Sequence, residues 1–291
     1  MIEISSQNLI RNLQQFRKKI GPKVKLMAII KANAYGHGIG QVSQIVAENG
    51  ADWLGVNNLE EGLQIRRLGI NLPVLILGYV PLAVLKTAAE NNLSLVVYDR
   101  ETVKELPAGA KVHLKIETGT NRQGIRPEKA MVRVGIGLYG LLPSKETRIF
   151  AQQAKAKFQL KPVLTWKTRI VQVKIVPKTE TVSYGRTWRA SRQSKIAVLP
   201  VGYYDGYDRK LSNCGRVLIH GQFVSVAGRI CMNMTMVDVT NIANVKLEDE
   251  VILIGRQGKN EVTAEELAEK IGTINYEVVS RINPLIPRKV V

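Results

Sequence analysis

The stretch that decides the fold is VKLMAIIKANAYGHG, residues 24–38. A mainly apolar run ends at a single lysine, Lys31, and small, flexible residues follow it with one tyrosine, Tyr35, among them. This pattern predicts a buried strand that presents one amine to a loop. An amine that is partly desolvated at a strand end loses its proton easily and can attack a carbonyl carbon, as in a Schiff base with an aldehyde cofactor. The alternative is a lysine whose ammonium group reaches solvent where the strand ends.

Length and composition indicate an ordinary soluble globular chain. It has 291 residues, 45% hydrophobic and 23% charged, enough for one or two domains with a sizeable core. The first residues, MIEISSQNLI, lack the basic and apolar regions of a secretory signal. The longest apolar stretch, residues 72–85, is interrupted by Pro73, Gly78 and Pro81 and is too short to span a bilayer. We therefore expect no membrane association.

Cysteine content and charge bear on compartment and partners. Cys214 and Cys231 are the only cysteines and form no CxxC pair, which favours a reduced cytoplasmic setting and no metal site. The net charge of +18 raises the possibility of nucleic-acid binding. The basic residues are scattered, however, with no run longer than residues 17–19, and aromatic content is only 5%. We interpret the charge as a solvated surface.

Periodicity divides the chain into two parts. Up to about residue 150, short apolar strands alternate with amphipathic helices, which is typical of parallel βαβ units and of an α/β barrel. The expected strands are 24–31, 52–56, 73–77, 94–97, 111–117 and 132–136, and the expected helices are 6–19, 39–49, 58–69, 81–91 and 99–105. Beyond it come β-rich runs, 162–176, 195–201, 215–230 and 234–240, and one late helix, 263–271. We predict a (β/α) barrel in residues 1–152 and a mainly β domain in residues 153–291.

Further motifs follow along the chain. HLKIETGTNRQGI, residues 113–125, contains Lys115 and Arg122, and VRVGIGLYG, residues 132–140, contains Arg133 before two glycines. Taken alone, Lys115 or Arg122 is better explained by an ion pair with Glu117 at a strand end. The glycines that follow Arg133 in a strand favour a functional role for that arginine over a surface ion pair. In the β-rich part, the motifs are SYG at 183–185, VGYYDG at 201–206 and GRICMN at 228–233.

Together with IIKANAYGHG, these motifs resemble, in the same order, those of the alanine racemase family. The resemblance covers most of the chain and implies a fold of barrel plus β domain with pyridoxal 5'-phosphate as cofactor. It implies that Lys31 carries the cofactor as a Schiff base and that the Tyr35 hydroxyl binds its phosphate. It also implies that Arg133 donates to the pyridine nitrogen and that the backbone amides of Gly135 and Ile136 bind phosphate.

The resemblance further implies interconversion of L-alanine and D-alanine, which supplies D-alanine for peptidoglycan. Racemisation needs proton removal on one face of the α-carbon and delivery on the other, so two bases are required. Lys31 and Tyr184 take these two places, and Lys115 is a candidate for carbamylation. The implied substrate-binding residues are Arg122, Tyr203 and Met232. Because the family's tyrosine-bearing half comes from the partner subunit, a homodimer with shared active sites is implied.

This chain departs from the family pattern within the barrel. Arg122 and Arg133 are eleven residues apart, where family members carry further βα units with a histidine and an Asn-Ser pair. We expect roughly seventy residues and two strands to be missing from the eight-stranded barrel. The remaining six strands must then re-pair, leave edges or borrow a partner. Asn233 stands where the family usually has aspartate, and Pro284 where some members have tyrosine.

Alternatives to an active racemase remain open. One is a cofactor-binding relative without activity that serves in dimerisation or cofactor handling. Pyridoxal-phosphate homeostasis proteins share the first motif but lack a β domain with SYG and ICMN. The other alternative is a basic nucleic-acid-binding protein, and a steep salt dependence of DNA binding would reveal it.

Overall fold

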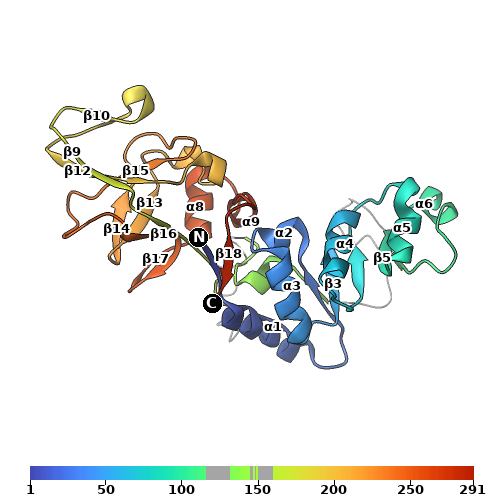
Figure 1. The fold of residues 1–291 in the computed structure, drawn as a ribbon. Coiled ribbons are helices and arrows are strands. Elements are labelled where there is room, and N and C mark those ends of the chain that lie inside the picture. The colour runs from blue at the N-terminus through green and yellow to red at the C-terminus, as the bar shows by residue number, and fades with distance from the viewer. Residues whose placement is uncertain (116–131, 145–146, 148, 150–159) are drawn as a thin grey trace. The chain divides into compact units, whose positions relative to one another are not determined.

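The computed structural model describes residues 1–115, 132–144, 147, 149 and 160–291. These residues form two compact units, one α/β and one mainly β (Figure 1). Ser6–Leu142 belong to the α/β unit, and Met1–Ser5 and Pro162–Val291 belong to the β unit. The predicted domain boundary at residues 152 and 153 lies outside the described residues.

Six parallel strands form the sheet of the α/β unit, in the order β6-β5-β4-β3-β2-β7. Their bounds are β2 Leu26–Ile29, β3 Trp53–Val56, β4 Val74–Ile76, β5 Leu93–Val97, β6 Val112–Leu114 and β7 Val132–Val134. Every predicted strand of this part is present; β5 begins one residue earlier than predicted, and the other strands have narrower bounds within the described residues. The predicted α/β fold class is therefore confirmed.

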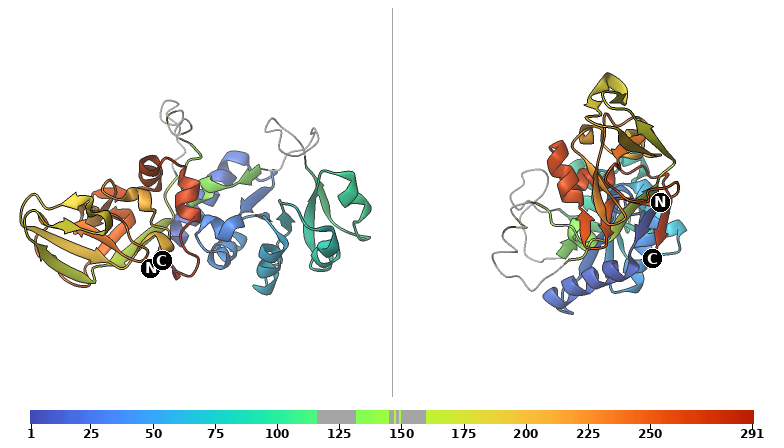
Figure 2. Two further views of the ribbon diagram at one scale, coloured as in Figure 1. Left: turned by 90° about the horizontal axis from the view of Figure 1, so that it is seen from above. Right: turned by 90° about the vertical axis from the view of Figure 1, so that its left-hand side faces the viewer.

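The helices of this unit also match the prediction. They are α1 Ser6–Ile20, α3 Ile39–Glu48, α4 Leu59–Arg67, α5 Leu85–Glu90 and α6 Arg100–Lys104. The predicted helix 81–91 is divided into a 3-10 turn, η1 (Leu82–Val84), and α5. Helices α3, α4 and α5 follow one another along the sheet in the order of the strands between them, as Figures 1 and 2 show.

The sheet has two outer strands within the described residues. β7 pairs directly with β2, as Met27 lies opposite Arg133, while β6 pairs with β5 alone. Every residue of β2, β4 and β5 is buried, as expected for parallel strands covered on both faces. In β6, by contrast, Val112 and Leu114 are 45% and 55% exposed. Within the described residues, the sheet is therefore open and has two edge strands, β7 and β6.

The larger sheet of the β unit has the order β14-β13-β16-β8-β1-β18, with β17 paired to β16. The bounds are β1 Ile2–Ile4, β8 Leu164–Arg169, β13 Arg216–Ile219, β14 Gln222–Ser225, β16 Glu250–Gln257, β17 Asn260–Val262 and β18 Arg288–Val290. Residues 1–5, which the sequence prediction counted with the barrel, contribute β1, whose Ile2 and Ile4 are fully buried. The two chain termini lie close together because β1 pairs with β18, the last strand (Figure 1).

A second sheet and a hairpin complete the β strands. The sheet has the order β15-β12-β9, and the hairpin pairs β10 with β11. The bounds are β9 Gln172–Val176, β10 Thr181–Val182, β11 Trp188–Arg189, β12 Ser194–Leu199 and β15 Thr235–Asp238. The helices are α8 Ala264–Ile271, which Thr263 caps as predicted, and α9 Asn275–Ser280. A mainly β second domain is confirmed.

Among the described residues, none of the helices has the length and apolar character that crossing a bilayer requires.

Candidate active site

Lys31 lies at the carboxyl end of β2, as the sequence predicts. Ile30, which is fully buried, donates its N–H to the carbonyl of Gly55 at the end of β3 (2.8 Å). The next residue, Lys31, is half-buried. The carboxyl ends of parallel strands are where α/β folds place their reactive side chains.

A left-handed turn, α2 (Lys31–Tyr35), follows the strand directly. Ala32, Asn33, Ala34 and Tyr35 have φ values of 53°, 52°, 53° and 53°. Such a backbone costs about 1–2 kcal/mol per residue for L-amino acids, so surrounding contacts must hold it. One of these contacts is the Asn33 side-chain oxygen, which accepts the N–H of Ile39 at the start of α3 (2.9 Å).

Glu61 supplies a second contact, and sequence reasoning missed it. Its carboxylate accepts the N–H of Ala32 at 2.7 Å and the N–H of Asn57 at 2.7 Å. Asn58 caps α4 by accepting the N–H of Glu61 (3.0 Å). The spacing of Asn58 and Glu61 fits a capping box, in which the glutamate reaches back to the N-cap amide. Here it reaches two other amides, a difference that no local pattern predicts.

The predicted phosphate-binding residues Tyr35, Gly135 and Ile136 come together. A Cβ built on Gly135 would lie 3.2 Å from the Tyr35 hydroxyl oxygen. The 3-10 turn η2 (Ile136–Tyr139) begins immediately after this glycine. The first N–H groups of a helical turn lack partners within the turn and attract anions. The bare glycine therefore leaves room beside a hydroxyl and a turn N-terminus, an arrangement that fits a phosphate group.

Tyr139 packs against both Tyr35 and His37. The sequence did not predict a role for Tyr139 or His37. The Tyr139 hydroxyl donates to the carbonyl of Ile29 in β2 (2.9 Å), and burial raises its pKa well above the ordinary value. Its ring centroid is 5.4 Å from that of Tyr35 and 4.3 Å from that of His37. His37 Nδ1 lies 3.0 Å from the carbonyl oxygens of Ala34 and Tyr35, so this nitrogen carries the proton. Both residues stand inside the motifs YGHG and GLYG, but their packing role has no local signal.

Of the three other predicted site residues in the α/β part of the chain, the structure describes Lys115 and Arg133. Lys115 follows β6, is half-buried and donates its N–H to the carbonyl of Val97 (2.9 Å). Arg133 lies in β7, beside the strand that leads to Lys31. Arg122 lies outside the described residues.

The loops that carry Tyr184, Tyr203 and Met232 touch one another in the β unit. Tyr203, the first residue of η4 (Tyr203–Asp205), donates its N–H to the carbonyl of Cys231 (3.1 Å). Ser183, next to Tyr184 in η3 (Tyr184–Arg186), donates its hydroxyl to the carbonyl of Arg229 (2.5 Å). Tyr184, Tyr203 and Met232 are 72%, 42% and 54% exposed.

Glycine makes this close approach possible. A Cβ on Gly202 would lie 2.4 Å from the carbonyl oxygen of Met232, and one on Gly228 would lie 2.6 Å from that of Val182. Only glycine can occupy such positions without moving the backbone. The predicted residues are thus assembled in two sets, one in each compact unit.

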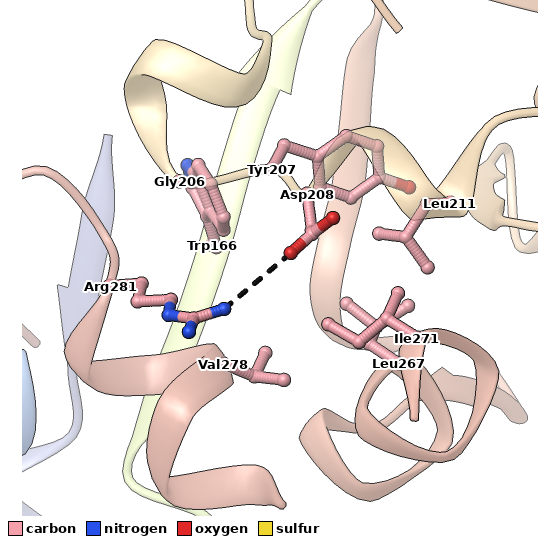
Figure 3. A pocket seen from close by; sticks show the side chains of 9 residues that line it. All are labelled: Trp166, Gly206, Tyr207, Asp208, Leu211, Leu267, Ile271, Val278 and Arg281. Carbon is pink, nitrogen blue, oxygen red and sulfur yellow. Dashed lines mark ion pairs between the residues drawn. The ribbon is translucent and has the colours of Figure 1, made fainter. Parts of the chain in front are cut away.

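A small cavity elsewhere in the β unit contains none of the predicted residues (Figure 3). Apolar side chains line most of it, and Arg281 pairs with Asp208 across one side at 3.7 Å. The buried Tyr207 hydroxyl has no hydrogen-bond partner among the described residues. Because none of the predicted site residues lines this cavity, the candidate site is the Lys31 region.

A strand-end lysine on a parallel α/β sheet, with a tyrosine hydroxyl and a glycine-headed turn beside it, defines a class of pyridoxal-phosphate enzymes. Two family models match this chain and show which family of this class it belongs to. The family model described as "Alanine racemase, N-terminal domain" matches residues 4–131, and "Alanine racemase, C-terminal domain" matches residues 163–290. This chain belongs to the alanine racemase family.

Individual proteins that resemble this chain are alanine racemases as well. The chain is 34% identical to alanine racemase 2 of Caldanaerobacter subterraneus subsp. tengcongensis, over 99% of this chain and 93% of the relative. It is 35% identical to an alanine racemase of Leptospira interrogans, over 100% of this chain and 95% of the relative. Among solved structures, it matches the alanine racemase from Bacillus anthracis with bound L-Ala-P at a TM-score of 0.91, with 29% identity, 100% of this chain and 94% of that chain covered.

These alignments also show a large internal gap. The Leptospira alignment runs over 370 positions, whereas this chain has 291 residues, so at least 79 of its positions have no residue here. An internal shortening is therefore confirmed, while its place between Arg122 and Arg133 stays a prediction.

Proposed function

We propose that this chain is an alanine racemase that interconverts L-alanine and D-alanine with pyridoxal 5'-phosphate and so supplies D-alanine for peptidoglycan. The observation that carries the proposal is the placing of Lys31 at the end of β2, in the same turn as Tyr35, whose hydroxyl lies against Gly135. Membership of the alanine racemase family supports the same activity. The cytoplasmic location stays a prediction.

The residues of the α/β unit fit the cofactor. Lys31 is the attachment point, Tyr35 donates its hydroxyl to the phosphate, and the amides of Gly135 and Ile136 receive the phosphate at the start of η2. Arg133 is the proposed partner of the pyridine nitrogen. When bound, pyridoxal phosphate supplies an electron sink that makes the α-proton of an amino acid acidic.

Two bases act on that proton in our proposal. The Lys31 amine serves one face of the α-carbon and the Tyr184 hydroxyl serves the other, because inversion requires removal and delivery from opposite sides. Tyr203, Met232 and Arg122 hold the substrate, and Lys115 is the candidate for carbamylation.

We further propose a homodimer in which the β unit of one subunit completes the site of its partner. Tyr184, Tyr203 and Met232 lie exposed on loops that touch, and clustered exposed apolar side chains are typical of interaction surfaces.

A second candidate function is cofactor binding without racemisation. The exposed edge strand β6 and the gap of at least 79 positions favour it, because we predict that the missing residues belong to the sheet that frames the site.

Proton exchange separates the two candidates. The full-length chain, reconstituted with pyridoxal phosphate in deuterated water, is given L-alanine or D-alanine, and NMR follows loss of the α-proton. Exchange with inversion from both enantiomers supports racemisation. Bound cofactor without exchange supports the second candidate.

A further inference from the structure

We infer that Glu61 is a positioning residue for Lys31, holding the backbone from which the lysine side chain leaves. The inference rests on the proposed function, in which Lys31 attaches the cofactor. It assigns a role to a side chain that the reaction scheme above does not use.

Glu61 binds a pair of backbone amides. One carboxylate oxygen accepts the N–H of Ala32 and the other accepts the N–H of Asn57, both at 2.7 Å. Ala32 follows Lys31 after β2, and Asn57 follows β3. A single carboxylate therefore ties together the loops that leave two neighbouring strands at the active-site end of the sheet.

One of these bonds holds the peptide plane between Lys31 and Ala32. The nitrogen of Ala32 is bonded to the carbonyl carbon of Lys31, and the peptide unit is planar. Holding the Ala32 N–H in place fixes the orientation of that plane, and with it one of the two backbone torsions of Lys31. Because the next four residues have left-handed φ values, this junction departs from ordinary helical geometry and needs such a restraint.

The two bonds require the carboxylate group of Glu61. A carboxylate offers two acceptor oxygens, and charge-assisted bonds to N–H groups are short and strong. A glutamine in this place would present one acceptor and one NH₂ group, so one backbone N–H would face another donor. The restraint thus depends on the carboxylate and not merely on side-chain length.

The neighbouring Glu60 provides a matched control. It also lies in the first turn of α4, where acidic residues stabilise the helix through its dipole, but it is exposed. Glu60→Gln therefore removes the same charge from the same turn.

The test uses the full-length chain without added substrate. Wild type, Glu61→Gln and Glu60→Gln are incubated with pyridoxal phosphate and reduced with borohydride, and mass spectrometry of peptides measures the rate at which each lysine is modified. We expect Glu61→Gln to slow modification of Lys31 by about tenfold, the usual order for losing a hydrogen bond to a charged group, and to leave other lysines unchanged. Amide hydrogen exchange at Ala32 and Asn57 should accelerate in this variant alone.

A wild-type rate at Lys31 in Glu61→Gln, with the fold intact by circular dichroism, would overturn the inference and leave the proposed function standing. Absence of preferential Lys31 modification in wild type would overturn the proposed attachment and the inference with it. If Glu61→Gln does not fold, Glu61→Asp keeps the charge but cannot span both amides. It should slow Lys31 modification by about threefold or more, and an unchanged rate would again refute the role.

Discussion

The Tyr35 hydroxyl and Gly135 meet across 100 residues of sequence, with only 3.2 Å between the oxygen and the place where a Cβ on Gly135 would stand. Because that distance is tighter than ordinary van der Waals contact, even a methyl group must push the hydroxyl aside. The glycine is therefore a requirement of the space beside Tyr35, where we place the cofactor phosphate.

Gly135→Ala should weaken pyridoxal phosphate binding by about tenfold, since displacing one donor removes a bond to a charged group. A fluorescence titration of the cofactor measures this effect. The control is Gly40→Ala in α3, where the nearest atom to the new Cβ is Leu68 Cδ1 at 3.9 Å. That variant should bind normally and be more stable by about 0.5–1 kcal/mol, because alanine favours a helix over glycine. Equal affinities in the two variants would contradict the phosphate assignment.

Lys31→Ala should abolish the absorbance of the Schiff base with pyridoxal phosphate while leaving the fold intact, because Lys31 is only half-buried. Absorption spectra with circular dichroism check both parts. Retention of the absorbance would mean that another lysine carries the cofactor.

Tyr184→Phe should slow α-proton exchange much more strongly for one alanine enantiomer than for the other, since it removes a base from one face only. Its thermal stability should stay near that of wild type because the side chain is 72% exposed. NMR in deuterated water compares the enantiomers. Equal slowing would remove the basis of the two-base assignment.

Mixing two inactive variants tests the shared site. Subunits carrying Lys31→Ala and subunits carrying Tyr184→Phe should regain racemisation after they exchange partners, because one site of each mixed dimer then has both bases. Racemase assays before and after refolding the mixture measure the recovery. If Lys31 and Tyr184 act within one subunit, no activity returns.

Tyr139→Phe should lower the free energy of unfolding, whereas Tyr207→Phe should not. Tyr139 donates to the Ile29 carbonyl, so its loss should cost about 1–2 kcal/mol. The buried Tyr207 hydroxyl has no partner among the described residues, so removing it should be neutral or stabilising. Urea denaturation at pH 8 measures both values, and a large loss in Tyr207→Phe would indicate an unseen hydrogen bond.

The same two tyrosines predict the alkaline limit of stability. Burial raises the pKa of each hydroxyl, so both stay protonated in the folded chain at a pH where the unfolded chain has lost those protons. Their contribution is fully present below the unfolded pKa of about 10 and declines as the pH rises above it. Urea denaturation between pH 8 and 11 should show this decline, and each Phe variant should reduce its slope.

Local signals in the sequence were enough for the strands of the α/β sheet, for the helices α1, α3, α4, α5 and α6 and for the lysine at the end of β2. They did not predict β1, β10, β11, β16, β17, β18 or α9. The apolar run before Lys31 predicts β2, and the polar and glycine residues after it predict a loop, because both depend on neighbours in the chain. The other predicted site residues came from the family motifs. The short interval between Arg122 and Arg133 predicted an internal shortening, and the length of the alignments confirms that residues are missing within the chain.

What the sequence by itself determined, then, was the order of the strands and helices of the α/β sheet, the lysine at the end of β2 and the membership of a family. Only the tertiary structure decided that β1 pairs with β8 and β18, that β7 lies against β2, and that Tyr139 packs under Tyr35. It also revealed the left-handed turn after Lys31 and the two amides bound by Glu61. These contacts join residues far apart in the chain, and their partners are chosen by strand order and by the space left in the packed core, neither of which a local pattern encodes.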